Sequence, residues 1–336
     1  MTRIALIGFG YWGPNMARNI SNSQTTQLIA VVDRSESRRA VARAAYPNAL
    51  VCGEIQELNP EEIDAVIIAT PANSHFELTR FFLELHKHVL VEKPLATNLD
   101  QARKLVNLAK KSDCVLMVDH TYLFSDSVAL MKESVDRGEL GELVCFDSTR
   151  INLGIFQPDV SVVWDLAVHD VAILSYITGM KPNSVSATAQ VHPLTKHPAV
   201  SSLSIDYAGR FSARILVSWL SPVKVRRTCL TGVDQTIVFD DSLSDEKIKI
   251  YESGVEAVIA EEGMGALVKY RLGNIRIPRL PGTEALKREI EQFVFAIEQK
   301  INPVSSGLFA LEVISILEAA HESIMQGGAS VAVRYS

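Results

Sequence analysis

The first 120 or so residues alternate between strand-like and helix-like patterns, and this alternation constrains the fold more than any other feature. Short apolar runs rich in β-branched residues are typical of strands buried on both faces. These runs are Ile4–Ile7, Leu28–Val32, Ala65–Ala69, Val89–Val91 and Val115–Val118, and the helical patterns between them are Trp12–Ile20, Glu36–Ala45, Ser74–Leu85 and Leu99–Lys111. Repeated βα units predict an α/β fold with a doubly wound parallel sheet and helices on both faces.

The pattern changes after about Tyr122. Strand-like runs separated by turn residues fill most of the stretch from Asn183 to Tyr251. Helices are expected at Ser125–Arg137, Val162–Tyr176, Thr283–Lys300 and Gly307–Gln326, and a strand at Leu143–Ile151. We therefore predict two domains, a doubly wound domain over residues 1–121 and an α+β domain with an open, largely antiparallel sheet over residues 122–336.

Composition narrows the class of protein. The chain has 336 residues, 47% of them apolar and 21% charged, which suits two globular domains. A net charge of −6 gives no electrostatic reason to expect a nucleic-acid partner. The four cysteines form no C-x-x-C pair, no apolar run is long enough to span a membrane, and the apolar N-terminal run is too short for a signal peptide. We expect a cytoplasmic protein with no membrane partner and no metal site.

A dinucleotide site is predicted at the start of the chain. Residues Gly8–Gly13 read G-F-G-Y-W-G directly after the first strand, and Asp33 follows about 20 residues later, at the end of the second strand. The helix N-terminus would bind the cofactor phosphates. Asp33 would accept hydrogen bonds from the adenosine ribose and repel a 2′-phosphate, which favours NAD, while Arg34 keeps NADP as an alternative. The expected contacts here are Gly8, Gly10, Tyr11, Trp12, Gly13, Asp33 and Arg34.

A second loop at the same edge of the sheet follows the strand at Ala65–Ala69. It reads T-P-A-N-S-H over Thr70–His75. Ligands of open α/β sheets bind at the carboxyl ends of the strands. We expect Thr70, Pro71 and Asn73 to line the cofactor, although Asn73 or Ser74 could instead cap the next helix. His75 would either contact the cofactor or be solvated at the helix end.

Two further motifs carry groups suited to proton transfer. Glu92-Lys93-Pro94 follows the fifth strand, so Lys93 should point into the cleft beside the cofactor, and the proline indicates a cis or rigid turn. Asp165 and His169 are four residues apart in a predicted helix and share one face. A carboxylate beside an imidazole can orient it for proton transfer from an alcohol. Taken singly, Lys93 could be a surface lysine and the other two a helix ion pair.

Together, these motifs resemble the Gfo/Idh/MocA family of oxidoreductases over essentially the whole chain. The resemblance implies a Rossmann domain that binds NAD(P), with Glu92 and Lys93 among its cofactor contacts, and a substrate-binding and oligomerisation domain. It assigns the catalytic roles to Lys93, Asp165 and His169. Relatives use the open sheet face to form dimers and tetramers, so we expect a homodimer or homotetramer. Val217, Trp219 and Val225 are the candidate residues for that exposed face.

A finer resemblance points to a subgroup associated with nucleotide-sugar dehydrogenases, including UDP-N-acetylglucosamine 3-dehydrogenases. It rests on Gly10–Asn15, Arg150–Gly154 and Trp164–Ala167, with Val168 departing from the proline expected before the histidine. We therefore expect an NAD-dependent enzyme that removes a hydride from a sugar hydroxyl carbon, C3 of a nucleotide-linked hexose. The expected substrate contacts are Tyr122, Arg150, Asn152 and His169. The alternatives are an NADPH-dependent keto-sugar reductase, a polyol dehydrogenase acting on an inositol-like substrate, and a dinucleotide-binding sensor without turnover.

Overall fold

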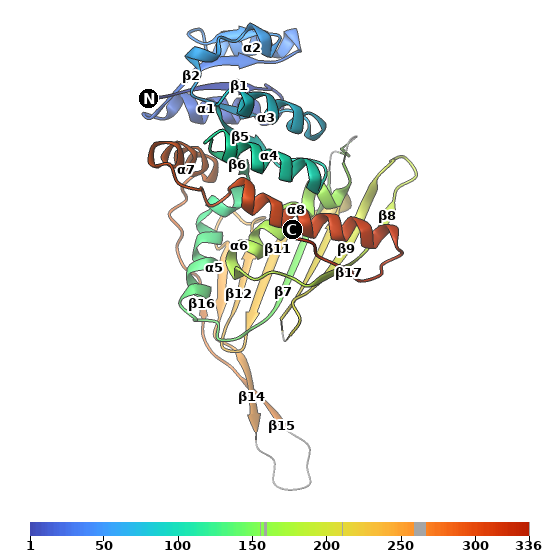
Figure 1. Ribbon diagram of the computed structural model, residues 1–336. Coiled ribbons are helices and arrows are strands. Elements are labelled where there is room, and N and C mark those ends of the chain that lie inside the picture. The colour runs from blue at the N-terminus through green and yellow to red at the C-terminus, as the bar shows by residue number, and fades with distance from the viewer. Residues whose placement is uncertain (155, 158–159, 210, 259–266, 336) are drawn as a thin grey trace. The chain divides into compact units, whose positions relative to one another are not determined.

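The computed structural model describes residues 1–154, 156–157, 160–209, 211–258 and 267–335 (Figure 1). The chain forms two compact units. Unit 1 contains Met1–Ser125 together with Thr283–Ser315 and Tyr335, and unit 2 contains Asp126–Gly282 and Ile316–Arg334. The predicted division after residue 121 lies close to the change at Ser125. It did not anticipate that Thr283–Ser315, assigned to the second domain, returns to unit 1.

Unit 1 is built on a six-stranded parallel sheet with the strand order β3-β2-β1-β4-β5-β6 (Figure 1). The strands are β1 (Thr2–Ile7), β2 (Thr26–Val32), β3 (Leu50–Cys52), β4 (Ala65–Ile68), β5 (His88–Glu92) and β6 (Leu116–Asp119). The helices are α1 (Gly13–Asn22), α2 (Glu36–Ala45), α3 (His75–Glu84), α4 (Leu99–Lys111) and α7 (Ala285–Gln299). This order is that of the dinucleotide-binding Rossmann fold and confirms the predicted doubly wound sheet.

The strands of unit 1 follow from their apolar runs. Ile4, Val66 and Leu90, in three of these strands, are completely buried, as expected for a sheet covered on both faces. The edge strand β3 was not predicted, because only Cys52 of its three residues is buried and the run is too short to show a period. The carboxyl ends of β1, β2, β4, β5 and β6 carry the motifs singled out above.

Unit 2 contains a nine-stranded sheet with the order β16-β13-β12-β11-β7-β10-β9-β8-β17. All neighbours are antiparallel except β7 and β10, so the predicted largely antiparallel sheet is confirmed. Its strands are β7 (Leu143–Leu153), β8 (Ser184–Val191), β9 (Pro198–Asp206), β10 (Ser212–Ser218), β11 (Leu220–Gly232), β12 (Thr236–Asp240), β13 (Ile248–Tyr251), β16 (Ile275–Arg276) and β17 (Val331–Ala332). A separate hairpin pairs β14 (Gly254–Val258) with β15 (Leu267–Arg271).

Helices cover one face of the unit 2 sheet. They are α5 (Asp126–Asp136), α6 (Val168–Thr178) and the later part of α8 (Gly307–Met325) (Figure 1). The helix predicted over Val162–Tyr176 is divided, since a π-helical turn over Val163–Ala167 precedes α6. Among the helices in the described ranges, none is both long enough and apolar enough to cross a membrane.

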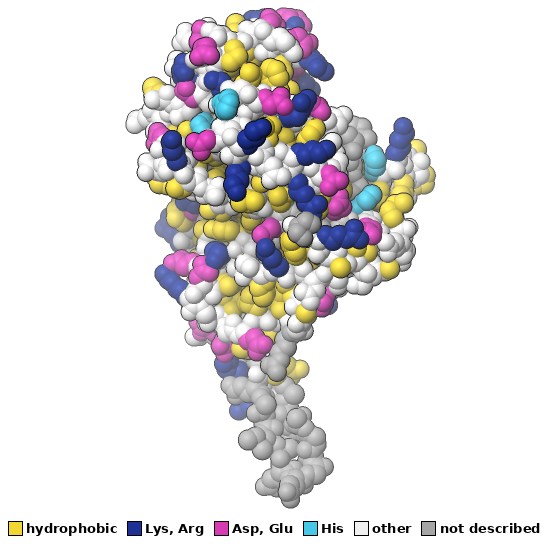
Figure 2. Space-filling view, viewed as in Figure 1, with side chains coloured by type: hydrophobic (Ala, Val, Ile, Leu, Met, Phe, Trp, Pro, Cys, Tyr) yellow, Lys and Arg dark blue, Asp and Glu magenta, His cyan; other side chains and the backbone are white. Residues whose placement is uncertain are grey.

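The predicted exposure of Val217 and Trp219 is wrong. Val217 is buried because the apolar positions of β10 alternate toward the helices, and Trp219, just after the end of β10, is buried as well. The opposite face carries Arg214, which forms an ion pair with Asp147 of β7, and the partly exposed Leu216. Figure 2 shows the molecule from the side of these helices, where Lys and Arg side chains are interspersed with Asp and Glu. On the opposite face of the sheet, the exposed positions of β10 include a charged residue that pairs with the neighbouring strand.

Candidate active site

The glycine-rich loop of unit 1 is shaped for close backbone packing and for an anion. Gly8 has φ +97°, and a Cβ atom there would lie 2.4 Å from the carbonyl oxygen of Ala69. At Gly13 a Cβ atom would lie 2.6 Å from the carbonyl oxygen of Gly8. Gly10 is more open, since the nearest atom to a Cβ there is Nη1 of Arg38 at 3.5 Å. Two of the three glycines are thus required by the turn itself.

The N-terminus of α1 fits the phosphates of a dinucleotide. No side chain caps this helix end, and its first turn contains no acidic residue. The positive end of the helix dipole therefore faces outward without a competing carboxylate. Of the three aromatic residues in the loop, Phe9 is buried, Tyr11 is largely exposed and Trp12 is partly exposed. The rings of Tyr11 and Trp12 meet edge to face with centroids 5.7 Å apart. Both are accessible to a bound cofactor.

Asp33 connects the glycine loop with the loop after β2. Its Oδ2 accepts a hydrogen bond from the Phe9 N–H at 2.7 Å, and its Oδ1 accepts one from the Ser35 N–H at 2.8 Å. A carboxylate offers about four acceptor positions, so each oxygen can still accept a ribose hydroxyl. The carboxylate is thus fixed by main-chain donors, and this fit agrees with NAD as the cofactor.

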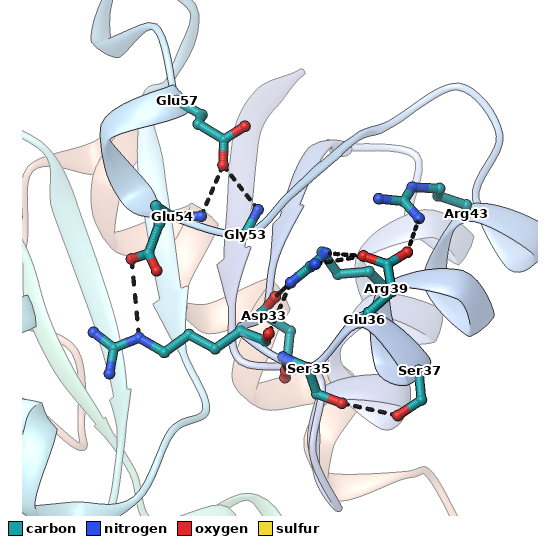
Figure 3. Close-up of polar contacts among 10 residues, drawn as sticks. Asp33, Ser35, Glu36, Ser37, Arg39, Arg43, Gly53, Glu54 and Glu57 are labelled. Carbon is teal, nitrogen blue, oxygen red and sulfur yellow. Dashed lines mark hydrogen bonds and ion pairs between the residues drawn. The ribbon is translucent and has the colours of Figure 1, made fainter.

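Three arginines surround Asp33, and they differ in what they contact. Arg34 points to Glu54, with its Nε 3.9 Å from Oε2, and is almost fully exposed. Arg39 donates to the carbonyl oxygens of Asp33 and Arg34 and forms an ion pair with Glu36 (Figure 3). Arg38 lies closest to the carboxylate, with its Nη1 3.6 Å from Oδ2 of Asp33. Arg38 was not among the residues predicted from the sequence, although its place in the first turn of α2, close after Asp33, was an available signal.

His75 joins two loops of unit 1 through its ring. Its Nδ1 lies 2.7 Å from the carbonyl oxygen of Pro94, and its Nε2 lies 2.8 Å from that of Thr70. The residue is buried, so it is not solvated at a helix end, as one alternative had it. Pro71 and Asn73 are exposed, and neither Asn73 nor Ser74 caps α3 with its side chain. His75 therefore ties the Thr70 loop to the turn that contains Lys93.

Lys93 lies in a turn directly after β5. The Lys93–Pro94 peptide bond is cis, in agreement with the predicted cis or rigid turn. The backbone N–H of Lys93 donates to Oε2 of Glu92 at 3.2 Å. Glu92 itself is buried, and burial together with the Asp119 carboxylate raises its pKa well above the ordinary value, while Lys93 opposes the shift. The Glu92 carboxyl thus faces the interior of unit 1.

In unit 2, Asp165 is held by a residue that the sequence analysis had placed elsewhere. The indole Nε1–H of Trp219 donates to Oδ2 of Asp165 at 3.0 Å. Asp165 lies within the π-helical turn and His169 in the first turn of α6, and both are partly buried. Single π-helical turns are frequent at functional sites. No sequence pattern marks Trp219, because it follows β10, where the strand alternation has ended.

Arg150 forms a buried ion pair with Asp170, the residue after His169. Its Nε lies 2.8 Å from Oδ2 and its Nη2 3.1 Å from Oδ1 of Asp170, and Ser148 donates to the same carboxylate at 2.7 Å. The two charged side chains are 4% and 1% exposed. The pair anchors the start of α6 to β7. Asn152 lies at the end of β7, and Tyr122 lies in unit 1 in the 3₁₀ turn Thr121–Phe124.

The predicted site residues therefore fall into two sets. Unit 1 carries the glycine loop, Asp33, the Thr70–His75 loop, Lys93 and Tyr122, at the carboxyl ends of its strands. Unit 2 carries Arg150, Asn152, Asp165 and His169. A hollow of about 500 Å³ lies at the opposite, amino edge of the unit 1 sheet and does not belong to this site. Its lining includes Thr2, Arg3, Asp64, His86 and His88.

Comparisons with known proteins match both parts of the chain to one family. Residues 2–120 match the model described as "Oxidoreductase family, NAD-binding Rossmann fold", and residues 128–238 match the GFO/IDH/MocA C-terminal domain. The chain is 31% identical to the oxidoreductase YdgJ of Escherichia coli K12 over 57% of its own length and 58% of that protein. It is 24% identical to inositol 2-dehydrogenase of Rhizobium meliloti 1021 over 96% of the chain and 97% of that protein.

The fold also resembles that of UDP-N-acetylglucosamine 3-dehydrogenase GnnA from Acidithiobacillus ferrooxidans. The TM-score is 0.78 at 22% identity, over 96% of this chain and 97% of that one. This likeness concerns the fold.

Proposed function

Because the chain belongs to the Gfo/Idh/MocA family of oxidoreductases, with an NAD-binding Rossmann domain, we propose that it removes a hydride from a hydroxyl-bearing carbon of a nucleotide-linked hexose. The observation that carries the enzymatic part is the way two of the proposed groups are held in place. The backbone N–H of Lys93 donates to the Glu92 carboxylate, and the Asp165 carboxylate accepts a hydrogen bond from a buried indole. Such fixed polar groups suit catalysis, because little reorganisation is needed during reaction.

The cofactor end of the site is supplied by unit 1. Bound NAD would supply the hydride acceptor, while the protein positions it. The uncapped N-terminus of α1 would bind the diphosphate, and Asp33 would accept hydrogen bonds from the adenosine ribose. Tyr11, Trp12 and Thr70 are further candidate contacts.

The proton of the substrate hydroxyl is assigned to His169. An imidazole exchanges protons near neutral pH and can accept this one as the C–H bond breaks. Lys93 would donate a hydrogen bond to the developing alkoxide. Asp165 would orient the imidazole, and its own orientation comes from Trp219. In the reverse direction the same groups would protonate a keto sugar.

The test of these roles is a pair of substitutions with matched controls. Lys93→Met and His169→Ala should each lower kcat by about 100-fold or more, while NAD binding measured by fluorescence titration persists. The controls Lys104→Met and His321→Ala change exposed residues of the same types and should leave kcat within about twofold. Near-normal turnover of either site variant would remove its assignment.

The proposed substrate is a UDP-N-acetylhexosamine oxidised at C3. The motifs Gly10–Asn15 and Arg150–Gly154 support it. The buried ion pair of Arg150 with Asp170 shows that this guanidinium has an intramolecular partner, so the diphosphate would need other cations, such as Arg226 or Arg227 of β11.

A cyclic polyol is the second candidate. The full-length match with an inositol 2-dehydrogenase favours it. UDP-N-acetylglucosamine, free N-acetylglucosamine, dTDP-hexoses and inositol should be offered with NAD, together with a system that reoxidises NADH. Turnover of UDP-N-acetylglucosamine alone would support the nucleotide sugar. Turnover of inositol or free sugars alone would exclude it and leave the oxidoreductase assignment in place.

A further inference from the structure

Three carboxyl groups lie together in the interior of unit 1, next to the turn that contains Lys93. Glu92 ends β5 and Asp119 ends β6, and the two residues are paired in the strand register. The third, Glu289, comes from α7, in the segment that returns to unit 1 late in the chain. Their exposures are 8%, 3% and 0%. Carboxyl groups are almost never buried this completely unless something compensates their charge.

Hydrogen-bond donors are too few for three carboxylates. The Thr121 N–H donates to Oδ1 of Asp119 at 3.0 Å, and the Thr121 hydroxyl donates to the same oxygen. Oε2 of Glu92 accepts from the Lys93 N–H. In the described part of the chain, neither oxygen of Glu289 has a hydrogen-bond partner. An ionised carboxylate can only accept, so two of them can be joined only by a proton that one of them carries.

The electrostatic environment of the cluster also favours a protonated carboxyl. Burial raises the pKa of Glu289 well above its ordinary value, and the neighbouring carboxylates of Asp119 and Glu92 raise it further, while the Thr121 side chain has a smaller, opposing effect. Among the residues that the structure describes, no group of three or more His, Cys, Asp or Glu side chains could hold a metal ion. A bound proton is therefore the compensation open to these carboxyls.

The surrounding titratable groups do not replace that proton. Lys93 is the nearest cation and acts on Glu92, lowering its pKa against the larger effect of burial. His120 is buried edge to face against Phe309, and burial followed by the charge of Lys93 lowers its pKa to about 3, so it is neutral. Arg288, beside Glu289 on α7, donates to the Phe124 carbonyl oxygen at 3.4 Å.

We propose that Glu92, Asp119 and Glu289 form a proton-sharing carboxyl cluster, in which Glu289 is a positioning residue for the turn that contains Lys93. A proton held between Glu289 and Asp119 lets the three carboxyl groups remain together in a buried site. The position of Glu92 is thereby fixed, and Glu92 in turn holds the Lys93 backbone by accepting a hydrogen bond from the Lys93 N–H. The positioning of Lys93 for catalysis rests on the proposed function, whereas the protonation of the cluster is independent of it.

The first test is the pH dependence of unfolding of the full chain, compared with Glu289→Gln. A carboxyl whose pKa is raised on folding binds its proton more tightly in the folded state. The unfolding constant then rises about tenfold per pH unit for each such group, above the pKa of the unfolded chain and up to that of the folded one. In Glu289→Gln, the rise of the unfolding constant between pH 5 and 8 should be smaller by up to about tenfold per pH unit. Glu298→Gln changes an exposed residue on the same helix, and its unfolding constant should follow that of the wild type. Parallel curves for wild type and Glu289→Gln would overturn the cluster.

A second measurement needs no variant. Infrared spectra of the wild-type chain in D₂O should show the stretching band of a protonated carboxyl at pH 8, and its absence would equally overturn the cluster.

The link to Lys93 is tested by turnover. Glu289→Gln should move the alkaline limb of the kcat/KM profile, and Glu298→Gln should not. An unmoved limb with altered unfolding would refute the positioning role alone.

Discussion

Trp219 donates its indole N–H to Oδ2 of Asp165 at 3.0 Å, and this bond fixes the carboxylate four residues before His169. Trp219 is 1% exposed and Asp165 is partly buried, so this hydrogen bond to a charged group is partly shielded from water. The sequence predicted that Asp165 orients His169. The structure adds the residue that orients Asp165.

Trp219→Phe keeps most of the apolar volume and removes the donor. We expect kcat to fall by about tenfold and the free energy of unfolding to fall by about 1.5–3 kcal/mol, the usual contribution of a hydrogen bond to a charged group. NAD affinity should not change, because the dinucleotide contacts lie in unit 1. Steady-state kinetics, denaturant unfolding and cofactor titration measure the three effects. A variant with normal kcat would show that Asp165 needs no orientation.

Asp33 and Arg38 should set the choice of dinucleotide. The Asp33 carboxylate repels a 2′-phosphate, so Asp33→Ser should reduce the preference for NAD over NADP by about tenfold or more. In that background, Arg38→Ala should abolish the gain in NADP binding, whereas Arg34→Ala should have less effect, because Arg34 points to Glu54. Dissociation constants for both cofactors provide the measurement. A larger effect of Arg34→Ala would reverse the order of these two arginines.

The buried pair Arg150–Asp170 and the exposed pair Arg214–Asp147 form a matched comparison within one sheet. Asp170→Asn leaves a buried guanidinium without its charge partner and should cost about 3–5 kcal/mol of unfolding free energy. Asp147→Asn breaks an exposed pair and should lower the free energy of unfolding far less. Denaturant unfolding measures both. Similar small costs would mean that Asp170 does not anchor α6.

His120 should make the protein less stable in acid. Its pKa is lowered to about 3 by burial, so the unfolded chain, with a pKa near 6.5, binds the proton first as the pH falls. Its contribution is fully present above about pH 6.5, and below that pH the unfolding constant should rise by up to about tenfold per unit. His120→Leu should remove this component between pH 7 and 5, and the exposed His321→Gln should not. An identical acid profile in wild type and His120→Leu would contradict the prediction.

Periodic burial made the order of the elements predictable. The runs that became β1, β2, β4, β5 and β6 are buried on both faces, and the helix over Glu36–Ala45 was placed with the bounds it has in the structure. The glycine loop was predictable for a local reason, since Gly8 and Gly13 leave no room for a Cβ atom. The cofactor end of the site depends mostly on such short-range constraints.

What depends on contacts between distant segments was not predictable. His75 bonds to the carbonyl of Pro94, and Trp219 bonds to Asp165, and neither contact leaves a pattern in the sequence. Val217 and Trp219 were expected on an exposed face because they are apolar, but the helices cover the face that they occupy. The π-helical turn over Val163–Ala167 was also missed, because helix periodicity over a few residues does not separate π from α.

Because Thr283–Ser315 belongs to unit 1, this unit cannot finish folding when its first 125 residues have been synthesised. Ser305 accepts from the Val118 N–H and donates to the Val118 carbonyl oxygen, and α7 brings Glu289 to Asp119. A nascent chain that has released only its first 125 residues lacks these partners, so the end of β6 and its carboxyl stay open to water until the last segments emerge. An expression fragment of the Rossmann domain should therefore carry residues 283–315 on a linker.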